Sequence, residues 1–274
     1  ADIYVSTHPI YNGAMVPAIK RMGIKAKFIN VVTDLVSGHI AHYVPDVDHC
    51  IVPTEECRLE AIENLVPSEK ISVVGQPVWP DFRQRMGNRA ATRAALGLSD
   101  DLPVVLLMGG GDGMGRLGIT GQEVAFSGLP LQLVVVCGRN QTVQREMEYI
   151  NPRVPMKVLG FVNNIPELMG ASDILITKAG PGTIAEAFIA GLPILLYDAI
   201  PGQEEGNVDY VVNQGAGAWC PFLPYAVTKQ VKLLITDSER MNRMRAASAR
   251  LAKPDSAFEI AKIVARFAGD DPTA

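Results

Sequence analysis

Cysteine, aromatic residues, excess positive charge and long apolar runs are all scarce in this sequence. The four cysteines are scattered with no C-x-x-C pair, which excludes a disulfide scaffold or a zinc ribbon and suits a reducing compartment. Lysine and arginine number 25 against 29 acidic residues, so the net charge of −4 offers no basic field to nucleic acid. The longest apolar runs, such as Leu102–Met108 and Leu131–Cys137, have the length of a strand and are too short to cross a bilayer as a helix.

The remaining composition is that of a globular protein. Of 274 residues, 48% are apolar and 20% are charged, which argues against disorder. This length favours two domains. A strand-like run, Ile3–Ser6, begins almost at once, without a Met or a basic leader segment. Because domain termini are normally loose, we expect the chain to be a fragment cut inside a domain.

Short β-branched runs alternate with longer helical stretches along the chain. The apolar runs lack polar alternation, which is typical of strands buried on both faces of a parallel sheet, so the order predicts a doubly wound α/β fold. A proline-containing segment at 76–80 marks the expected boundary between a half Rossmann-like sheet, 1–80, and a second domain, 81–274. The expected strands are Ile3–Ser6, Lys27–Val32, His49–Val52, Ile71–Val74, Val104–Met108, Leu131–Cys137, Met156–Leu159, Ile174–Thr177 and Ile194–Tyr197.

Three loops that follow expected strands carry residue types that bind anions and hydroxyl groups. The first, Gly109–Gly115, reads GGGDGMG, and its glycines let backbone N–H groups approach an anion closely. The second, Thr177–Ala187, opens a helix, whose positive amino end attracts phosphate. In the third, Pro201–Asn207, the amides of Gln203 and Asn207 are four residues apart, on one face of an expected helix, and suit sugar hydroxyls. Loops after parallel strands meet at the carboxyl edge of a sheet, so we expect one ligand site there.

Each loop also has a purely structural interpretation, and a different nucleotide stays open. Thr183 and Glu186 match the S/T-x-x-E pattern of a helix capping box. Gly113–Gly118 matches G-x-G-x-x-G, and Arg139 after the next strand would suit a 2′-phosphate, so an NADP oxidoreductase remains an alternative. No Walker pattern is present.

Histidine is also scarce, with four residues in the chain. His8 and His39 follow strands of the first domain, and the ordinary pKa of histidine makes both candidates for an active-site role. A histidine in a loop is more often only exposed or hydrogen-bonded. His39 and His42 lie near two aspartates, but their spacing matches no helical metal pair, so we expect no metal site.

Several of these segments together resemble the monogalactosyldiacylglycerol synthases over nearly the whole chain. The most specific segment is Thr177–Ala187. The other matching segments are 107–115, 136–140, 160–162, 202–208 and 32–35 with His39. The wider group includes bacterial diacylglycerol glucosyltransferases and the peptidoglycan N-acetylglucosaminyltransferase. The resemblance implies a GT-B fold, in which two Rossmann-like domains face each other across a cleft and the N-terminal one is here incomplete.

The resemblance also implies roles for individual residues. Phe161 and Val162 would flank the uracil, Glu186 would bind the ribose, and His39 would lie on the acceptor side. The residues expected to bind UDP are Gly110, Gly111, Asp112, Arg139, Phe161, Val162, Gly182, Thr183, Ile184 and Glu186; glycines 110, 111 and 182 with Thr183 and Ile184 would hold the diphosphate. The residues expected to bind the sugar are Gln203, Glu204 and Asn207. Asp112 stands where plant members carry glutamate.

The implied activity is an inverting transfer of a hexose, with galactose favoured, from a UDP-sugar to the sn-3 hydroxyl of diacylglycerol. The family's general base belongs to a Gly-Gly-His loop that this sequence lacks. We therefore assign no catalytic residue and expect the chain to bind UDP-sugar but to catalyse poorly alone. We expect no cofactor, no obligate metal, no nucleic acid and a peripheral position on the cytoplasmic side of a membrane. The alternatives are a UDP-glucose-dependent diacylglycerol glucosyltransferase and a nucleotide-sugar-binding subunit completed by a partner chain.

Overall fold

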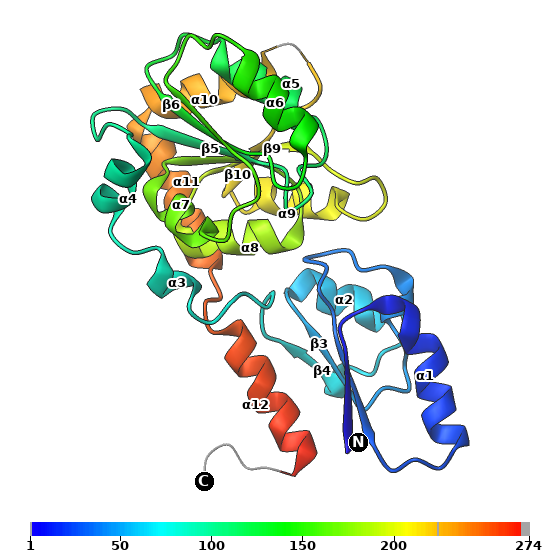
Figure 1. Cartoon of the computed structure of the whole chain (residues 1–274). Helices are drawn as coiled ribbons and strands as arrows, with labels where there is room; N and C mark the ends of the chain where they lie inside the picture. The colour runs from blue at the N-terminus through cyan, green and yellow to red at the C-terminus, as the bar shows by residue number, and fades with distance from the viewer. Residues whose placement is uncertain (1, 224, 270–274) are drawn as a thin grey trace. The chain divides into compact units, whose positions relative to one another are not determined.

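The computed structural model describes residues 2–223 and 225–269 and divides the chain into two compact units (Figure 1). The first unit contains the residues up to Pro80, the short segment Pro201–Asn207 and the residues from Lys253 onward. The second unit contains Asp81–Ile200 and Val208–Ala252. The break after Pro80 is where the sequence predicts it. Residues 253–269 were expected in the second domain, and this is corrected, because they pack in the first unit; residues 270–274 of the expected second domain lie outside the described residues.

The first unit is built on a four-stranded parallel sheet in the order β1-β2-β3-β4. One face is covered by α1 and α2, and the other is covered by α12 (Figure 1). Ile29, Val31 and Ile51 are buried beneath α12, and full burial of such a side chain contributes about 1.5–3 kcal/mol. The elements are β1 Ile3–Ser6, α1 Pro9–Arg21, β2 Lys27–Val31, η1 Ile40–His42, β3 His49–Val52, α2 Glu55–Glu63, η2 Ser68–Lys70, β4 Ile71–Val73 and α12 Ser256–Ala268.

The second unit is built on a six-stranded parallel sheet in the order β10-β9-β8-β5-β6-β7. Helices α5, α6 and α10 cover one face, and α7 and α8 lie on the other (Figure 1). The strands are β5 Val104–Met108, β6 Gln132–Val136, β7 Met156–Leu159, β8 Ile174–Lys178, β9 Ile194–Asp198 and β10 Gly217–Trp219. The helices are α3 Phe82–Arg85, α4 Arg89–Leu96, α5 Leu117–Ala125, α6 Gln141–Tyr149, α7 Ile165–Ala171, α8 Pro181–Ala190, α9 Glu205–Asn213, α10 Ala226–Thr236 and α11 Ser238–Leu251.

The direction of winding reverses in this sheet between β5 and β8. The chain passes from β5 to β6 and β7 on one side, then returns past β5 to form β8, β9 and β10 on the other. The loops after β5 and β8 therefore leave the same edge in opposite directions. In open α/β sheets, ligands bind outside the carboxyl ends of the strands at such a switch point. The topology alone thus points to two loops. One is Gly109–Gly115 after β5, which we call the glycine loop, and the other is the loop that precedes α8.

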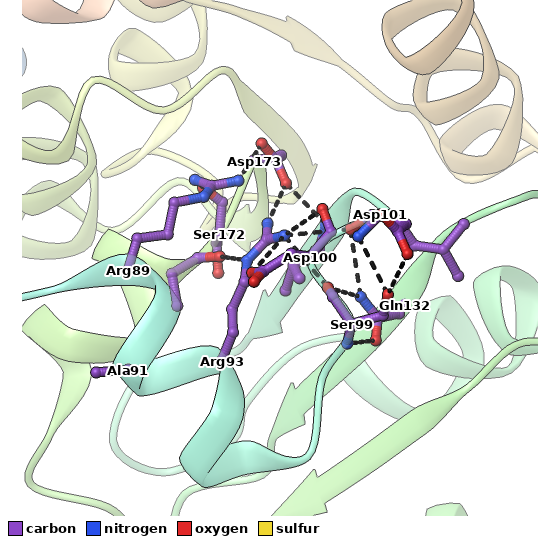
Figure 2. Close-up of polar contacts among 12 residues, drawn as sticks. Arg89, Ala91, Arg93, Ser99, Asp100, Asp101, Gln132, Ser172 and Asp173 are labelled. Atoms are coloured by element: carbon purple, nitrogen blue, oxygen red, sulfur yellow. Dashed lines mark hydrogen bonds and ion pairs between the residues drawn. The ribbon is translucent and has the colours of Figure 1, made fainter.

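A buried ionic cluster fastens the opposite, amino edge of the same sheet (Figure 2). Asp173, just before β8, receives bonds from Arg93 at 2.7 Å, Arg89 at 2.6 Å and Arg245 at 2.7 Å, and from the backbone N–H of Val104 at 2.9 Å. Burial opposes ionisation, but the Val104 N–H and the arginines hold the pKa of Asp173 below its ordinary value. The cluster ties α4 and α11 to the starts of β5 and β8, at a distance from the ligand edge.

The sequence predicted nine of the described strands to within two residues at either end. It missed strand β10, helices α3 and α7 and the short 3-10 helices η1 and η2. Strand β10 was missed because it has three residues, two of them glycine and alanine, which are not typical of strands. Helix α7 was missed because Pro166 and Gly170 interrupt its pattern; the proline stands in the first turn, where a missing N–H costs nothing.

Candidate functional site

The candidate site lies at the carboxyl edge of the second unit's sheet, where the loops after β5 and β6 pack against each other. The Arg139 N–H donates to the Gly111 carbonyl oxygen at 2.9 Å, and the Asn140 side chain donates to the Gly113 carbonyl oxygen at 3.0 Å. A side chain at Gly138 would collide with the Gly111 carbonyl oxygen, and its φ of +57° is in the left-handed region. The loop after β6 therefore packs closely against the glycine loop.

Arg139 and Phe161 form a stacked pair beside the glycine loop. The Arg139 guanidinium lies 4.7 Å from the centre of the Phe161 ring and 3.1 Å from the Asp112 carboxylate. The Phe161 side chain, just after β7, is 59% exposed and therefore has an open face. Three residues predicted to bind UDP are thus in contact with one another. A cation stacked on an exposed ring offers a flat surface to a nucleobase.

Helix α8 opens at this edge with free backbone donors. Gly180 precedes the first turn, Pro181 is its first residue, and no side chain caps it. The N–H groups of Gly182 and Thr183 are too near the helix start to have acceptors within the helix, so they are available to an anion. Ile184 differs, because its N–H donates to the Gly180 carbonyl oxygen at 3.1 Å and its side chain is fully buried. The predicted contact between Ile184 and the diphosphate stays a prediction.

Glu186 lies one turn further along α8. The capping-box alternative does not hold, because the helix starts at Pro181 and Thr183 lies inside it. Within the described part of the chain, the Glu186 carboxylate has no hydrogen-bond or ion-pair partner. Burial alone raises the pKa of Glu186 to about 7. Half-buried carboxylates without a partner are costly, so this one is best explained as an acceptor for a ligand.

The segment Pro201–Asn207 belongs to the first unit, which corrects its predicted assignment to the second domain. The helix begins at Glu205, so Gln203 lies before it and the predicted common helical face of Gln203 and Asn207 is wrong. Gln203 is exposed, whereas Glu204 and Asn207 are buried. Gln203 donates from Nε2 to the Asp34 carboxylate at 3.3 Å.

His39, the acceptor-side candidate, is exposed in the first unit. Its Nδ1 accepts from the Ala41 N–H at 3.2 Å and so caps the short helix η1. The buried histidine of this loop is His42, whose Nε2 lies 3.4 Å from Asp34. Sequence reasoning missed Asp34, since its contact with Gln203 joins residues 169 positions apart.

Two family models match the chain. The model of the glycosyltransferase family 28 C-terminal domain matches residues 105–260, which is more than half of the chain. The chain belongs to glycosyltransferase family 28. The model of monogalactosyldiacylglycerol (MGDG) synthase matches residues 1–78, which confirms the resemblance seen in the sequence.

Curated relatives of this family 28 member include plant proteins. A probable monogalactosyldiacylglycerol synthase 3 from Oryza sativa subsp. japonica is 40% identical over 271 residues, covering 95% of this chain and 53% of the relative. Monogalactosyldiacylglycerol synthase 3 from Arabidopsis thaliana is 37% identical over 270 residues, covering 95% and 58%. The chain thus spans about half the length of the curated relatives it matches.

Solved structures confirm the GT-B architecture of the family 28 chain. MurG from Acinetobacter baumannii matches with a TM-score of 0.69 at 16% identity, covering 97% of this chain and 75% of MurG. A UDP-GlcNAc 2-epimerase from Neisseria meningitidis bound to UDP-GlcNAc matches with a TM-score of 0.72 at 16% identity, covering 96% and 76%. At such identities the likeness shows the fold, two parallel-sheet α/β units, and no more.

Two searches of the described residues complete the account of the site. In residues 2–223 and 225–269, no helix combines the length and the apolar character needed to cross a bilayer. Over the same residues, no three His, Cys, Asp or Glu side chains gather closely enough to hold a metal ion.

Proposed function

We propose that this chain binds the UDP-sugar donor of an inverting glycosyltransferase that transfers a hexose, with galactose favoured, to the sn-3 hydroxyl of diacylglycerol. The observation that carries the proposal is the Glu186 carboxylate, which has no partner among the residues that the structure describes and lies one turn from the open amino end of α8, at the switch point of the second unit. A carboxylate can accept two hydrogen bonds from the vicinal hydroxyls of a ribose, while a helix amino end takes a diphosphate.

The chemistry follows from the charge of the leaving group. In a single displacement, the acceptor oxygen bonds to the anomeric carbon as the bond from that carbon to UDP breaks, and a base takes the hydroxyl proton. UDP leaves with increased negative charge, so donors already aimed at the diphosphate lower the barrier. The Gly182 and Thr183 amides supply such donors, and the proposal needs neither a resident metal nor a cofactor. The base is not assigned to any residue of this chain.

The relatives support galactose and diacylglycerol, since their names are those of monogalactosyldiacylglycerol synthases. Gln203 follows β9 in the chain and exposes its amide, which suits a sugar hydroxyl. Galactose and glucose differ only in the orientation of O4, so a UDP-glucose donor is the second candidate. Because the acceptor is a bilayer lipid, we place the working protein peripherally on the cytoplasmic side of a membrane. A partner chain that completes catalysis is the alternative.

Titration calorimetry of this chain with UDP, UDP-galactose, UDP-glucose and NADPH tests the proposal. We expect UDP and at least one UDP-hexose to bind, with NADPH at least a hundredfold weaker, and EDTA to leave UDP binding unchanged. Tight binding of NADPH without any response to UDP would overturn the proposal in favour of the oxidoreductase. If UDP-glucose binds clearly better than UDP-galactose, the donor is corrected to glucose.

A further inference from the structure

Lys178 ends strand β8 at the carboxyl edge of the second unit, half-buried and next to the glycine loop. Thr177, the residue before it, pairs with Met108, the last residue of β5. Gly109 and Lys178 therefore leave adjacent strands side by side. This is the pair of strands between which the winding of the sheet reverses.

A bulge redirects the chain at this lysine. Thr177 pairs with Leu196 of β9, whereas Lys178 pairs with Asp198, so one residue of β9 is passed over and the register shifts between Thr177 and Lys178. Bulges turn a side chain away from the direction that strand alternation would give it, and they are frequent next to active sites. Thr177 is fully buried in the sheet, while Lys178 leaves it at the edge.

The lysine stem reaches the glycine loop at Gly110. Gly110 has a φ of +75°, and the position that a Cβ would occupy there is 3.8 Å from Lys178 Cε. The ammonium nitrogen is one bond beyond this carbon. Because Gly110 has only hydrogen on its Cα, it has no side chain to separate the lysine from the backbone that was predicted to hold a phosphate.

Two arginines of this edge face carboxylates. Arg139 lies 3.1 Å from Asp112, and Arg116 lies 4.0 Å from Asp198 and donates to the Tyr197 carbonyl oxygen. Lys178 reaches the glycine loop at Gly110, four residues before the open N–H of Gly182 in the same chain segment. A diphosphate held by both the glycine loop and the start of α8 must come close to this ammonium group.

We infer that Lys178 is a cationic contact to the diphosphate of the nucleotide donor, which it holds in the ground state and stabilises as the leaving group. The inference rests on the proposed function and deepens it. A lysine is a compact point charge that follows a phosphate as it takes up negative charge, which suits this role. We therefore expect Lys178 to contribute to the binding of the diphosphate part of the ligand and not to the binding of the nucleoside part.

Calorimetry with UDP and uridine on the parent chain and on Lys178→Met tests this. Methionine keeps an unbranched stem beside Gly110 and removes the charge. We expect the Kd of UDP to rise about tenfold or more and the Kd of uridine to stay within twofold. The matched control is Lys157→Met, which changes an exposed lysine on β7 and should leave both constants unchanged.

A second measurement uses the parent chain and so does not depend on how the variant folds. Lysine acetylation followed by mass spectrometry should show Lys178 protected by UDP and not by uridine, with Lys157 equally reactive throughout. An unchanged Kd for UDP in Lys178→Met, an equal loss of uridine affinity, or no protection by UDP overturns the inference and leaves the donor assignment standing. Failure of the parent chain to bind UDP overturns both.

Discussion

The Asp34 carboxylate accepts a hydrogen bond from the Gln203 amide, with 3.3 Å between Oδ1 and Nε2. Although burial opposes ionisation, hydrogen bonds from His42 and Gln203 hold the pKa of Asp34 below its ordinary value, so the group is charged at neutral pH. A charged carboxylate only accepts, so the amide must turn its NH2 group toward it. The Gln203 carbonyl oxygen then faces away and can accept from a hydroxyl group.

Asp34→Asn tests the predicted contact of Gln203 with the donor sugar, and we expect it to weaken UDP-galactose binding selectively. Asparagine can either donate or accept, so the Gln203 amide would lose its fixed orientation. We expect the Kd of UDP-galactose to rise about threefold to tenfold, the value of one hydrogen bond, with the Kd of UDP unchanged. Calorimetry measures both constants. Asp46→Asn, at an exposed carboxylate paired with Lys20, is the control and should change neither. Equal effects on both ligands would show that Asp34 does not act through the sugar.

Glu186→Gln should weaken UDP binding and at the same time stabilise the ligand-free chain. The folded pKa of Glu186, about 7, is above its unfolded value, so the charged group destabilises the fold increasingly as pH rises from about 4 to 7. At pH 8 we expect unfolding to cost about 1 kcal/mol more in the variant and the Kd of UDP to rise about tenfold. Urea unfolding and calorimetry measure these effects.

The pH dependence of UDP binding gives a second test of the role of Glu186. Protonation of Glu186 below pH 7 removes an acceptor, so the ratio of parent to Glu186→Gln affinity for UDP should fall from pH 8 to pH 6. The control is Glu146→Gln, at an exposed glutamate of α6, which should leave the affinity and the stability unchanged. A variant that loses stability at pH 8 and keeps full UDP affinity would assign Glu186 a structural role.

Asp173→Asn should be among the most destabilising conservative changes in the second unit. It removes the charge shared by Arg89, Arg93 and Arg245 and leaves the Arg93 guanidinium buried without its carboxylate. We expect a loss of about 3–5 kcal/mol in urea unfolding. Asp100→Asn is the control, since Asp100 is 71% exposed and 3.9 Å from the same Arg93, and it should cost less than about 1 kcal/mol.

The loss of stability caused by Asp173→Asn should also depend on pH. Because the folded pKa of Asp173 is lowered, its contribution to stability is complete above its unfolded pKa and is lost as pH falls through the folded value. The difference in unfolding free energy between the parent and Asp173→Asn should be full at pH 7 and should narrow below about pH 4. A difference that is constant down to pH 3 would contradict the ion-pair explanation.

Phe161→Ala should weaken the binding of UDP and of uridine to the same extent if the open face of the ring contacts the base. We expect both Kd values to rise about tenfold. The side chain is exposed, so the free energy of unfolding should change by less than about 0.5 kcal/mol. Tyr149→Ala, at a 90% exposed aromatic ring of α6, is the control. If the variant lost affinity for UDP and kept its affinity for uridine, Phe161 would contact the phosphates and not the base.

Much of the fold was predictable because it depends on local patterns. Val104–Met108 is continuously apolar and Ile174–Lys178 begins with three apolar residues, and both strands lie in the middle of the sheet, buried on two faces. The GGGDGMG loop and the start of α8 carry their anion-binding chemistry in residue types, so the sequence places them at one edge correctly.

The remaining features depend on which distant parts of the chain meet. The pattern of α12 marks a helix with one apolar face, but nothing in it says which sheet the face covers. The Asp34 contact with Gln203 and the approach of Lys178 to Gly110 join segments whose spacing in sequence carries no signal. The capping-box pattern at Thr183 was misleading, because Pro181 starts the helix two residues earlier.

The return of α12 to the first sheet limits how this protein can be taken apart. The chain passes from one unit to the other after Pro80, Ile200, Asn207 and Ala252. A version that stops at Ala252 would keep every strand and yet uncover the aliphatic face formed by Ile29, Val31 and Ile51, a surface prone to aggregation. Chimeras that exchange the first unit among relatives must therefore carry residues 2–80 and 253–269 from the same parent.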